Sequence, residues 1–367
     1  MNPLLKAAYN FCFEKLPVPA RKLLGYLEFK FDDAPTVRQG SAASPRGRLG
    51  RGAVTFSIDF EMSWAWQYSR EKGEDYVTKG LREREQVPDL ISQFERYHIA
   101  ATWATVGHLF LTRCSRGAHG LAHPEMPRLQ PFESKWWRFP GGDWYQHDPC
   151  SDVKRDPAWY APDLIERILS SSVGHEVACH SFSHAGFGPY CPEEVAGAEL
   201  DACIDAMAQF GVKPSTIVFP GNEMGHFPLL AKKGIHIFRL PQEPALNVSL
   251  PYQRSDSLWA VPASVNIDSR PRWMPHLRLA RLKGLVDLAA HSGSAAHVWF
   301  HPSMPKDEME SILYPLLAYC AEKRDAGVLD VLTMAQVTEA TLRSAATALP
   351  DTSGAPESRT PDAHSRA

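Results

Sequence analysis

The chain has 367 residues and a mass of 40.9 kDa, with 44% hydrophobic and 22% charged residues. This composition is typical of a globular protein and excludes a mainly disordered, collagenous or coiled-coil chain. A net charge of −3 creates no basic field of the kind that attracts nucleic acid, so we expect no nucleic-acid partner. No apolar run reaches the roughly 18 residues of a membrane-spanning helix, and no secretory signal is evident, so we expect a cytoplasmic protein without a transmembrane segment.

Residues 1–52 form an N-terminal arm that differs from the rest of the chain in charge. The arm carries nine Lys and Arg against four Asp and Glu, a local balance of +5. Its pattern predicts a short amphipathic helix over 4–16, ended by Pro17 and Pro19, and a linker over 39–52. The charge and the apolar face favour weak contact with an anionic membrane surface. Packing of the helix on the folded body is the alternative and the more common arrangement.

Residues 53–348 form the expected folded domain, in which β-rich runs alternate with helical patterns. The runs predict strands at 53–59, 100–106, 176–179, 215–220, 235–240, 296–301 and 328–332. Helices are predicted near 83–97, 161–171, 192–210, 306–323 and 334–347. This alternation indicates an α/β fold of parallel strands, either a doubly wound sheet or a barrel. Active residues are therefore expected at the carboxyl ends of the strands.

The two ends of the domain and the cysteines add little chemistry. Residues 349–367 have almost nothing to bury and are expected to be a disordered tail. Seven cysteines with no C-x-x-C spacing indicate neither a disulfide framework nor a zinc ribbon. We therefore expect reduced thiols, used mostly as small core residues.

Two pairs of residues have the chemistry and spacing of a metal site. Asp59 and Glu61 end the first strand two residues apart, so both carboxylates point the same way from extended chain. His180 and His184 follow the strand at 176–179, and their i, i+4 spacing places two imidazoles on one face of a helical turn, as zinc requires. A solvated strand edge and a pair of structural histidines are the alternatives.

His301 is the third candidate, because it ends a strand and precedes a proline. Histidine is the commonest general acid or base near neutral pH, and its position directs it toward the strand-end face. A core histidine with satisfied hydrogen bonds is an equal alternative from the residues alone.

The order of these motifs resembles the polysaccharide deacetylase family, the NodB-like carbohydrate esterases. An acid pair follows the first strand, H-S-x-x-H follows a middle strand, FPGN at 219–222 makes a Pro-Gly turn, and a late strand ends in histidine. The stretches SWAWQ, ATWATVGHLF, WYAPDLIERI and VWFHP extend the resemblance over about residues 53–340. It implies a distorted (β/α)7 barrel that is a metal-dependent catalytic domain.

Matched residue by residue, the resemblance implies Asp59 as catalytic base and His301 as general acid. It implies Glu61, His180 and His184 as ligands of one divalent ion, most commonly zinc, with cobalt or nickel as options. Two positions depart from the usual pattern. Phe60 separates the two acids, and Gly221 stands where the family has an arginine that orients the base. We expect Arg239 to take over that orienting role.

The implied reaction is hydrolysis of a non-peptide amide, with N-deacetylation of an acetylated amino sugar or glycan as the leading case. Two histidines and one carboxylate leave an open position on a zinc-like ion for a water nucleophile. Asp59 takes the proton of that water, and His301 protonates the departing amine. One alternative is an allantoinase-like hydrolase of a small linear or cyclic amide. Another is a non-catalytic carbohydrate-binding protein, which the missing arginine suggests.

Aromatic and turn residues are candidates for contact with a carbohydrate substrate. The connection between Thr112 and Asp163 is long and rich in tryptophan and tyrosine, which suits either sugar binding or packing of the loop on the barrel. The residues expected to contact the substrate are Trp64, Trp144, Pro220, Gly221 and Asn222.

Overall fold

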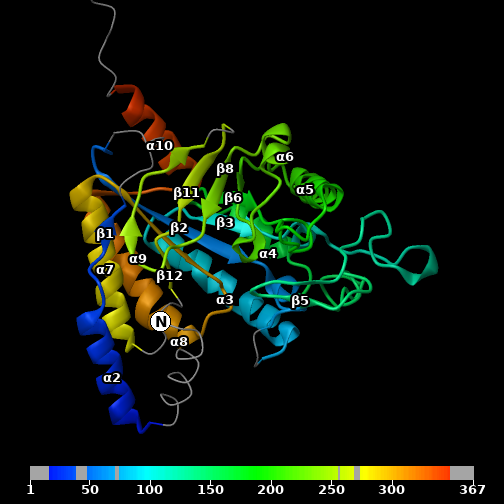
Figure 1. The fold of residues 1–367 in the computed structure, drawn as a ribbon, viewed down its shortest axis with the longest axis horizontal. Helices are drawn as coiled ribbons and strands as arrows, with labels where there is room; N and C mark the ends of the chain where they lie inside the picture. The colour runs from blue at the N-terminus through cyan, green and yellow to red at the C-terminus, as the bar shows by residue number, and fades with distance from the viewer. Residues whose placement is uncertain (1–15, 39–47, 71–73, 255–256, 268–272, 348–367) are drawn as a thin grey trace, which may run out of the picture.

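The computed structural model describes residues 16–38, 48–70, 74–254, 257–267 and 273–347. Its centre is one curled sheet, covered by helices (Figure 1). Its strands are β2 (Gly52–Phe60), β3 (Thr102–Thr105), β6 (Glu176–Cys179), β7 (Thr216–Ile217), β8 (Ile237–Leu240), β10 (Tyr252–Gln253), β11 (Trp259–Pro262), β12 (Val265–Asn266), β13 (Ala295–Phe300) and β14 (Leu329–Val331).

The two ends of this sheet meet at one bent segment of chain. The strand order is β10-β11-β8-β7-β6-β3-β2-β13-β12, and all neighbours are parallel except β10 and β11. Only Ala263 and Ser264 separate β11, which pairs with β8, from β12, which pairs with β13. β14 pairs with the start of β2, at residues 52–54. The expected α/β fold and distorted barrel are confirmed.

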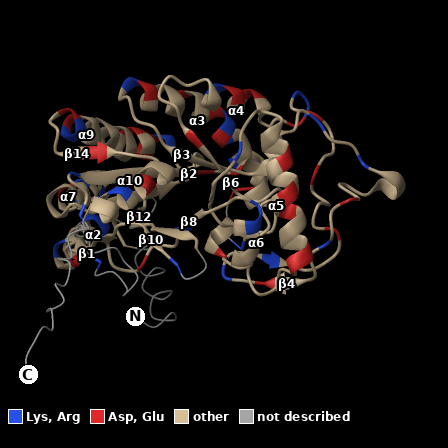
Figure 2. Ribbon diagram, turned by 90° about the horizontal axis from the view of Figure 1, so that it is seen from above, with Lys and Arg blue, Asp and Glu red and all other residues tan. Residues whose placement is uncertain are grey.

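Most of the helices lie between successive parallel strands, whereas the first described helix precedes the first strand and the last helix follows the last strand. The longer ones are α2 (Val18–Phe31), α3 (Tyr76–Arg96), α4 (Pro162–Leu169), α5 (Glu193–Ala208), α6 (Phe227–Lys232), α7 (Pro275–Ser292), α9 (Tyr314–Asp325) and α10 (Met334–Thr347). Short helical segments are η1 (Met62–Ala65), η2 (Gly107–Phe110), η3 (Ala118–Gly120), η4 (Pro220–Asn222), α8 (Lys306–Glu308) and η5 (Met309–Leu313). Figure 2 shows charges of both signs spread over the outer helices.

β2 is the central strand, and its sequence explains its position. All nine of its residues are buried, which is typical of a strand covered on both faces. It pairs with β13 along one side, and with β14 and β3 along the other. A strand held on both sides places the residues at its carboxyl end, Asp59 and Glu61, with little freedom.

The seven strands expected from the sequence are all present, with ends shifted by a few residues. The sequence pattern did not predict β11 and β12, because each is short and β11 ends in Pro262, a residue type that is rare inside a central strand. It also missed α6 and α7. In α7 the buried face includes Arg278, which bonds Glu308 at 2.8 Å, so a charged residue interrupts the apolar pattern.

Two smaller sheets and the N-terminal segment lie outside the barrel. β1 (Thr36–Val37) pairs with β9 (Asn247–Val248), and β4 (Phe132–Glu133) pairs with β5 (Arg138–Phe139). The helix expected at 4–16 lies outside the described residues, apart from Leu16, as do the tail and most of the expected linker.

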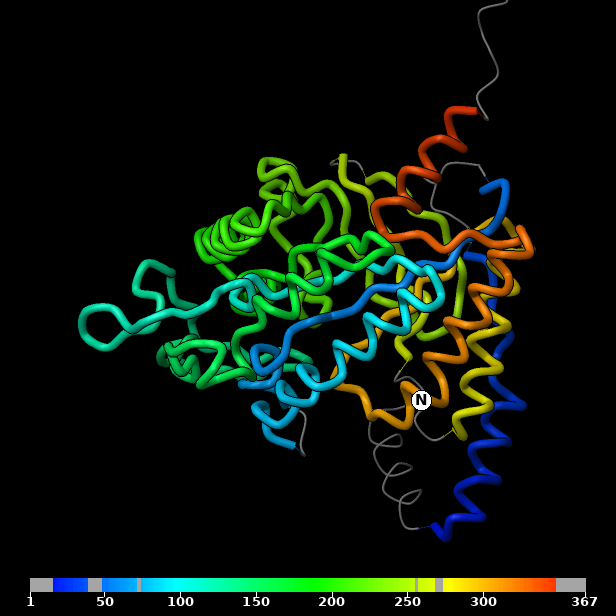
Figure 3. Tube along the Cα trace, turned by 180° about the vertical axis from the view of Figure 1, so that it is seen from behind, coloured from blue at the N-terminus to red at the C-terminus, as the bar shows by residue number. Residues whose placement is uncertain are grey.

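The described helix of the arm is α2, which begins just after Pro17 and has Pro19 in its first turn, so both prolines lie at the start of this helix. Figures 1 and 3 show α2 beside α7, and Asp32 bonds Arg281 there at 2.8 Å. Among the described residues, no helix combines the length and the apolar character needed to cross a membrane.

We expect Gly52→Ala to lower the free energy of unfolding by at least about 1–3 kcal/mol, because the added methyl group would overpack this contact and force the backbone to move. A Cβ at Gly52 would lie 2.0 Å from the carbonyl oxygen of Ala289 on α7. The matched control is Gly50→Ala, since nothing lies within 4 Å of a Cβ there. Urea denaturation of both variants makes the comparison, and equal stabilities would contradict close packing of α7 on β2.

Candidate active site

A cleft of about 550 Å³ opens at the carboxyl ends of the parallel strands. It contains six of the residues singled out from the sequence: Asp59, Glu61, His184, Gly221, Asn222 and His301. The other residues of its wall are Ala65, Trp66, Ser69, Arg70, Lys135, Trp136, Trp137, Asn266 and Trp299. The candidate acids and histidines of the cleft come from three separate segments of the chain, around residues 59–61, 184 and 301, and reach one space.

Glu61, His180 and His184 converge on one point. Oε2 of Glu61 lies 3.0 Å from Nε2 of His180 and 2.9 Å from Nε2 of His184. Nδ1 of His180 lies 2.7 Å from the carbonyl oxygen of Val218, to which it donates its proton. In the neutral ring this tautomer leaves a lone pair on Nε2, directed at the carboxylate, which is the arrangement of a metal ligand.

The second imidazole gives an independent test of whether a cation fits here. Nε2 of His184 forms no well-aligned hydrogen bond with any residue that the structure describes, although the side chain is buried. Burial lowers the pKa of His184, which opposes a charged ring despite the Glu61 carboxylate. Two imidazole nitrogens and one carboxylate oxygen are a donor set that suits zinc, cobalt or nickel. The residues present therefore fit a divalent ion.

The loop between the two histidines is not the helical turn that their spacing suggested. Residues 180–184 have no helical structure, and Ser181 and His184 both adopt positive φ, at 54° and 62°. Buried Glu199 of α5 holds this loop, because its Oε2 accepts the backbone N–H groups of Phe182 and Ser183 at 2.9 and 2.8 Å. A buried carboxylate thus sets the geometry that the i, i+4 spacing was expected to set.

Asp59 is clamped by Arg239 through two parallel hydrogen bonds. Nη1 of Arg239 donates to Oδ1 at 2.6 Å and Nη2 donates to Oδ2 at 2.7 Å, and both side chains are buried. Burial alone would raise the pKa of Asp59, but the guanidinium outweighs it and holds the pKa below its usual value. The carboxylate is therefore ionised and fixed in orientation, as a base requires. This geometry is what the expected orienting role of Arg239 needs.

His301 lies on the other side of Glu61. Its Nε2 is 3.3 Å from Oε1 of Glu61, and its side chain is 19% exposed to the cleft. The rings of Trp66 and Trp299 meet it edge to face, at centroid distances of 5.8 and 5.4 Å. One ligand atom each from Asp59, Glu61 and His301 lies within 4.8 Å of the others. Both expected proton carriers can thus reach the same small volume.

Glu83 of α3 is a site residue that sequence analysis did not find. Its Oε2 accepts the backbone N–H of Met62 at 2.9 Å and of Glu61 at 3.3 Å, which fixes the chain where Met62 has a positive φ. Burial and the nearby Glu61 raise the pKa of Glu83 to about 8. For Glu61 itself, burial would raise the pKa, but the nearby imidazoles of His184, His301 and His180 lower it well below its usual value.

The turn at η4 explains why Gly221 replaces the expected arginine. Gly221 has a φ of 57°, and a Cβ there would lie 2.0 Å from the indole of Trp137. Pro220 is buried beneath the turn, whereas Gly221 and Asn222 face the cleft. Trp137 therefore occupies the space that an arginine side chain would need, and the guanidinium comes from Arg239 in β8 instead.

Two tryptophans expected at the substrate lie in the packed interior, so that expectation is corrected. Trp64 is 1% exposed and packs against Trp159, and Trp144 is 3% exposed and donates to Ser183 at 2.8 Å. Four other tryptophans face the cleft: Trp66, Trp136, Trp137 and Trp299. Local sequence patterns do not distinguish these two groups, because each group lies in segments of different kinds: Trp64 is in η1 and Trp144 in a turn, whereas Trp299 is in β13.

We predict that Glu61, His180 and His184 hold one zinc ion per chain. The His180→Ala, His184→Ala double variant should purify with about one equivalent of zinc less than the unchanged chain, because it keeps only one donor. His291→Ala, which alters an exposed histidine of α7, should keep its zinc. Metal analysis by mass spectrometry measures all three, and equal zinc contents would rule out this donor set.

We also predict that Arg239→Met lowers the free energy of unfolding by about 3–5 kcal/mol, because it leaves a buried carboxylate without its counter-charge. Adding Asp59→Asn should recover part of that loss, as a double-mutant cycle would show. Arg84 forms an exposed counterpart, in which its Nη2 donates to both oxygens of Asp163 at 2.7 Å and the Asp163 side chain is 54% exposed. Arg84→Met should therefore cost under about 1 kcal/mol.

The pH dependence has a defined sign. Burial is the largest influence on the pKa of Asp59, and without Arg239 the guanidinium no longer opposes it, so the pKa of Asp59 in the folded protein should rise. A carboxyl group whose pKa is raised on folding favours the folded state at low pH, and that stability is lost as pH rises through the raised pKa. The loss in free energy of unfolding caused by Arg239→Met should therefore become smaller as the pH is lowered. A deficit that is constant between about pH 8 and pH 5 would contradict the assignment of Arg239 as the counter-charge of Asp59.

No protein-family model and no curated protein sequence matches this chain. Solved structures do match. A provisionally assigned polysaccharide deacetylase from Mycobacterium smegmatis aligns with a TM-score of 0.51 and 16% identity, over 91% of this chain and 99% of its own. A second, from Pseudomonas aeruginosa PAO1, aligns with a TM-score of 0.53 and 12% identity, over 79% and 91%. PuuE allantoinase aligns with a TM-score of 0.55 and 12% identity, over 84% and 97%. The chain therefore has the polysaccharide deacetylase fold that its motifs resemble.

Proposed function

We propose that the protein is a metal-dependent hydrolase of non-peptide amides, and that it removes acetyl groups from an acetylated amino sugar or glycan. One observation carries the proposal. A donor set for a divalent ion lies beside an ionised, clamped carboxylate and a cleft-facing histidine, at the strand ends of a deacetylase fold. Metal-assisted hydrolysis of an amide uses these three elements together: a metal-binding site, a base and an acid.

Glu61, His180 and His184 would hold the ion. Zinc, cobalt or nickel bound by such residues supplies Lewis acidity, which lowers the pKa of water and polarises a carbonyl group. The proposal assigns the proton transfers to the protein. Asp59, held ionised by Arg239, accepts the proton that water loses as it attacks the acetyl carbon. His301 donates a proton to the nitrogen that leaves, so the products are acetate and a free amine.

The walls of the cleft suit a sugar ring. Trp66, Trp136 and Trp299 offer flat apolar faces, and Arg70, Asn222 and Asn266 offer polar groups at the same opening. Aromatic faces with a few polar groups are the usual means by which proteins bind amphipathic ligands such as sugars. Trp136 is 46% exposed, so a ring that stacks on it would remove a large apolar area from water.

Hydrolysis of a small cyclic or linear amide is the second candidate, because the fold matches that of PuuE allantoinase equally well. Acetate release from N-acetyl sugars, compared with turnover of allantoin, separates the two. The third interpretation, a non-catalytic carbohydrate-binding protein, rested on a missing arginine. Arg239 supplies that guanidinium from another strand, which removes the reason for preferring it.

Weak contact of the N-terminal arm with an anionic membrane surface stays a prediction. It is supported by Leu23 and Phe31 of α2, which are 60% and 85% exposed. Exposed apolar residues beside basic ones are typical of helices that lie on membranes. A lipid-linked sugar would then reach the cleft from that surface.

The deacetylase activity is tested by acetate release from a panel of acetylated sugars and glycans, with zinc, cobalt or nickel. Asp59→Asn should abolish turnover, because an amide cannot accept the proton. His301→Ala should lose about 10²- to 10⁴-fold in rate, the usual contribution of one general acid. It should lose much less with an activated acetate ester, whose leaving group departs without protonation.

The control is His297→Gln, which alters a buried histidine four residues before His301 that bonds Ser57 at 2.8 Å rather than lining the cleft. Its rate should change far less than that of His301→Ala. Equal losses toward amide and ester in His301→Ala, with fold and metal content intact, would contradict the general-acid role. Failure of the whole panel alongside turnover of allantoin would favour the second candidate.

A further inference from the structure

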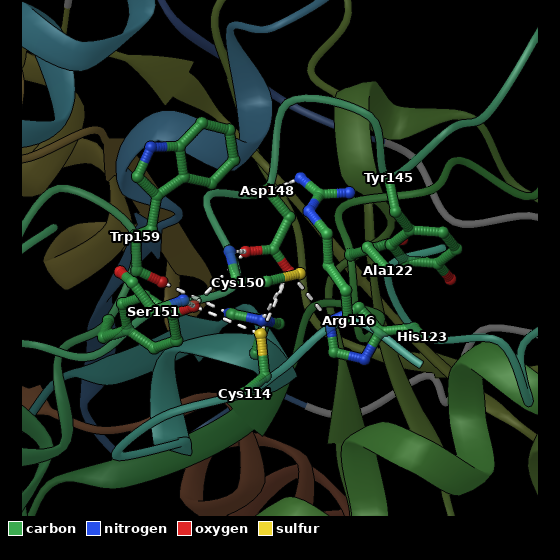
Figure 4. A network of polar contacts seen from close by, with 12 residues as sticks. Cys114, Arg116, Ala122, His123, Tyr145, Asp148, Cys150, Ser151 and Trp159 are labelled. Atoms are coloured by element: carbon green, nitrogen blue, oxygen red, sulfur yellow. Dashed lines mark hydrogen bonds and ion pairs between the residues drawn. The ribbon is translucent and has the colours of Figure 1, made fainter. Parts of the chain in front are cut away.

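A second cluster of potential metal ligands lies outside the cleft, and the proposed reaction does not use it (Figure 4). It consists of His108 on η2 and three residues of the 112–163 segment: Cys114, His123 and Asp148. One ligand atom from each lies within 4.8 Å of all the others. His108 and Asp148 are fully buried, and His123 is 7% exposed.

The four side chains meet at one carboxylate oxygen. Oδ2 of Asp148 lies 3.1 Å from Nε2 of His108, 2.8 Å from Nε2 of His123 and 3.4 Å from Sγ of Cys114. In a tetrahedral zinc site with bonds of about 2.0–2.3 Å, neighbouring ligand atoms lie roughly 3.3–3.8 Å apart. The four atoms are therefore near the separations that one zinc ion imposes.

Within the cluster, Nε2 of His108 is a buried nitrogen without a well-aligned hydrogen bond to any described residue. Its Nδ1 lies 3.3 Å from the carbonyl oxygen of Trp159, to which a protonated Nδ1 donates. In the neutral ring Nε2 then carries a lone pair aimed at an anionic oxygen, and it forms no well-aligned hydrogen bond with any described residue. The other neutral tautomer would place a lone pair against the Trp159 carbonyl instead. A cation between the ring and Asp148 satisfies both atoms.

Neighbouring groups hold the ligand side chains by the atoms that do not face the centre of the cluster. Oδ1 of Asp148 accepts the backbone N–H of Cys150 at 2.8 Å and the hydroxyl of Tyr160 at 3.3 Å, which leaves Oδ2 for the cluster. Nδ1 of His123 lies 3.4 Å from Oε1 of Glu125. A carboxylate or carbonyl behind each imidazole is the usual support of a metal-bound histidine.

We propose that His108, Cys114, His123 and Asp148 bind a structural zinc ion. Four protein ligands close the coordination sphere, so the ion has no open position for a substrate and its role is to hold the chain. The Cys114 thiol binds as thiolate and releases one proton to solvent when the ion enters. Because His108 belongs to the strand-end region of β3, the ion ties the 112–163 segment to the barrel.

Anchoring the 112–163 segment in this way also affects the wall of the cleft. The same segment carries Trp136 and Trp137, and the indole of Trp137 packs 5.2 Å from the ring of His184 and donates to the carbonyl of Ala65 at 3.0 Å. Anchoring the base of the segment restricts where these two walls of the cleft can lie. The second ion therefore supports the shape of the cleft without touching the reacting atoms.

Cobalt distinguishes the two metal sites, because Glu61, His180 and His184 offer only oxygen and nitrogen. The full chain, freed of metal by a chelator and loaded with Co²⁺, should show thiolate-to-cobalt charge-transfer absorption in the near ultraviolet. The band should persist in the His180→Ala, His184→Ala variant and disappear in Cys114→Ser. Cys150→Ser is the matched control, since it removes the neighbouring thiol and should keep the band.

Zinc content and limited proteolysis test the second site while its four ligand residues stay unchanged. The His180→Ala, His184→Ala variant should retain about one zinc per chain, and a chelator should expose residues 112–163 to limited proteolysis. Absence of both zinc and the cobalt band from that variant would overturn the second site, whatever the outcome for the deacetylase activity. Loss of the band in Cys150→Ser but not in Cys114→Ser would overturn the ligand set.

Discussion

Two carboxylates buried at the end of one strand are the constraint on which the rest of the site depends. Asp59 and Glu61 are each 3% exposed, and an isolated buried carboxylate is too costly to survive ionised. The two buried negative charges are balanced in two different ways. Asp59 receives a permanent cation, the fork of Arg239, whereas Glu61 faces three imidazoles whose charge depends on protonation. Only the second arrangement leaves room for a divalent ion to be the counter-charge.

The surrounding segments are arranged to keep these groups in place. Glu83 fixes the backbone beside Glu61, and Glu199 fixes the loop that carries His180 and His184. Each of these acids is buried in a helix and bonds backbone N–H groups instead of entering the cleft. The 112–163 segment then closes one side, with Trp137 lying against both Gly221 and His184. The strained backbone at Ser181 and His184, which both have positive φ, is held by these contacts.

Local patterns in the sequence predicted seven of the strands and singled out five residues, because each lies at the end of a strand or within five residues after it: Asp59, Glu61, His180, His184 and His301. The strand alternation predicted parallel strands in either a doubly wound sheet or a barrel. The resemblance of the motifs implied the distorted barrel, which the structure confirms. The pattern failed where tertiary packing decides: Trp64 and Trp144 are interior, and Pro262 interrupts the bent segment that closes the sheet. Glu83 and Glu199 read as ordinary helix residues, and the ligands at 108, 114, 123 and 148 follow no short metal-binding spacing. Their proximity depends on how a long connection folds.

The central claim is that a divalent ion sits at Glu61, His180 and His184 beside Asp59. The most direct measurement is anomalous diffraction at the zinc edge from crystals of the full chain grown with Zn²⁺. The account predicts a strong anomalous peak about 2.0–2.2 Å from one oxygen of Glu61 and from Nε2 of each histidine. Well-ordered density for all three side chains without an anomalous peak between them would contradict it.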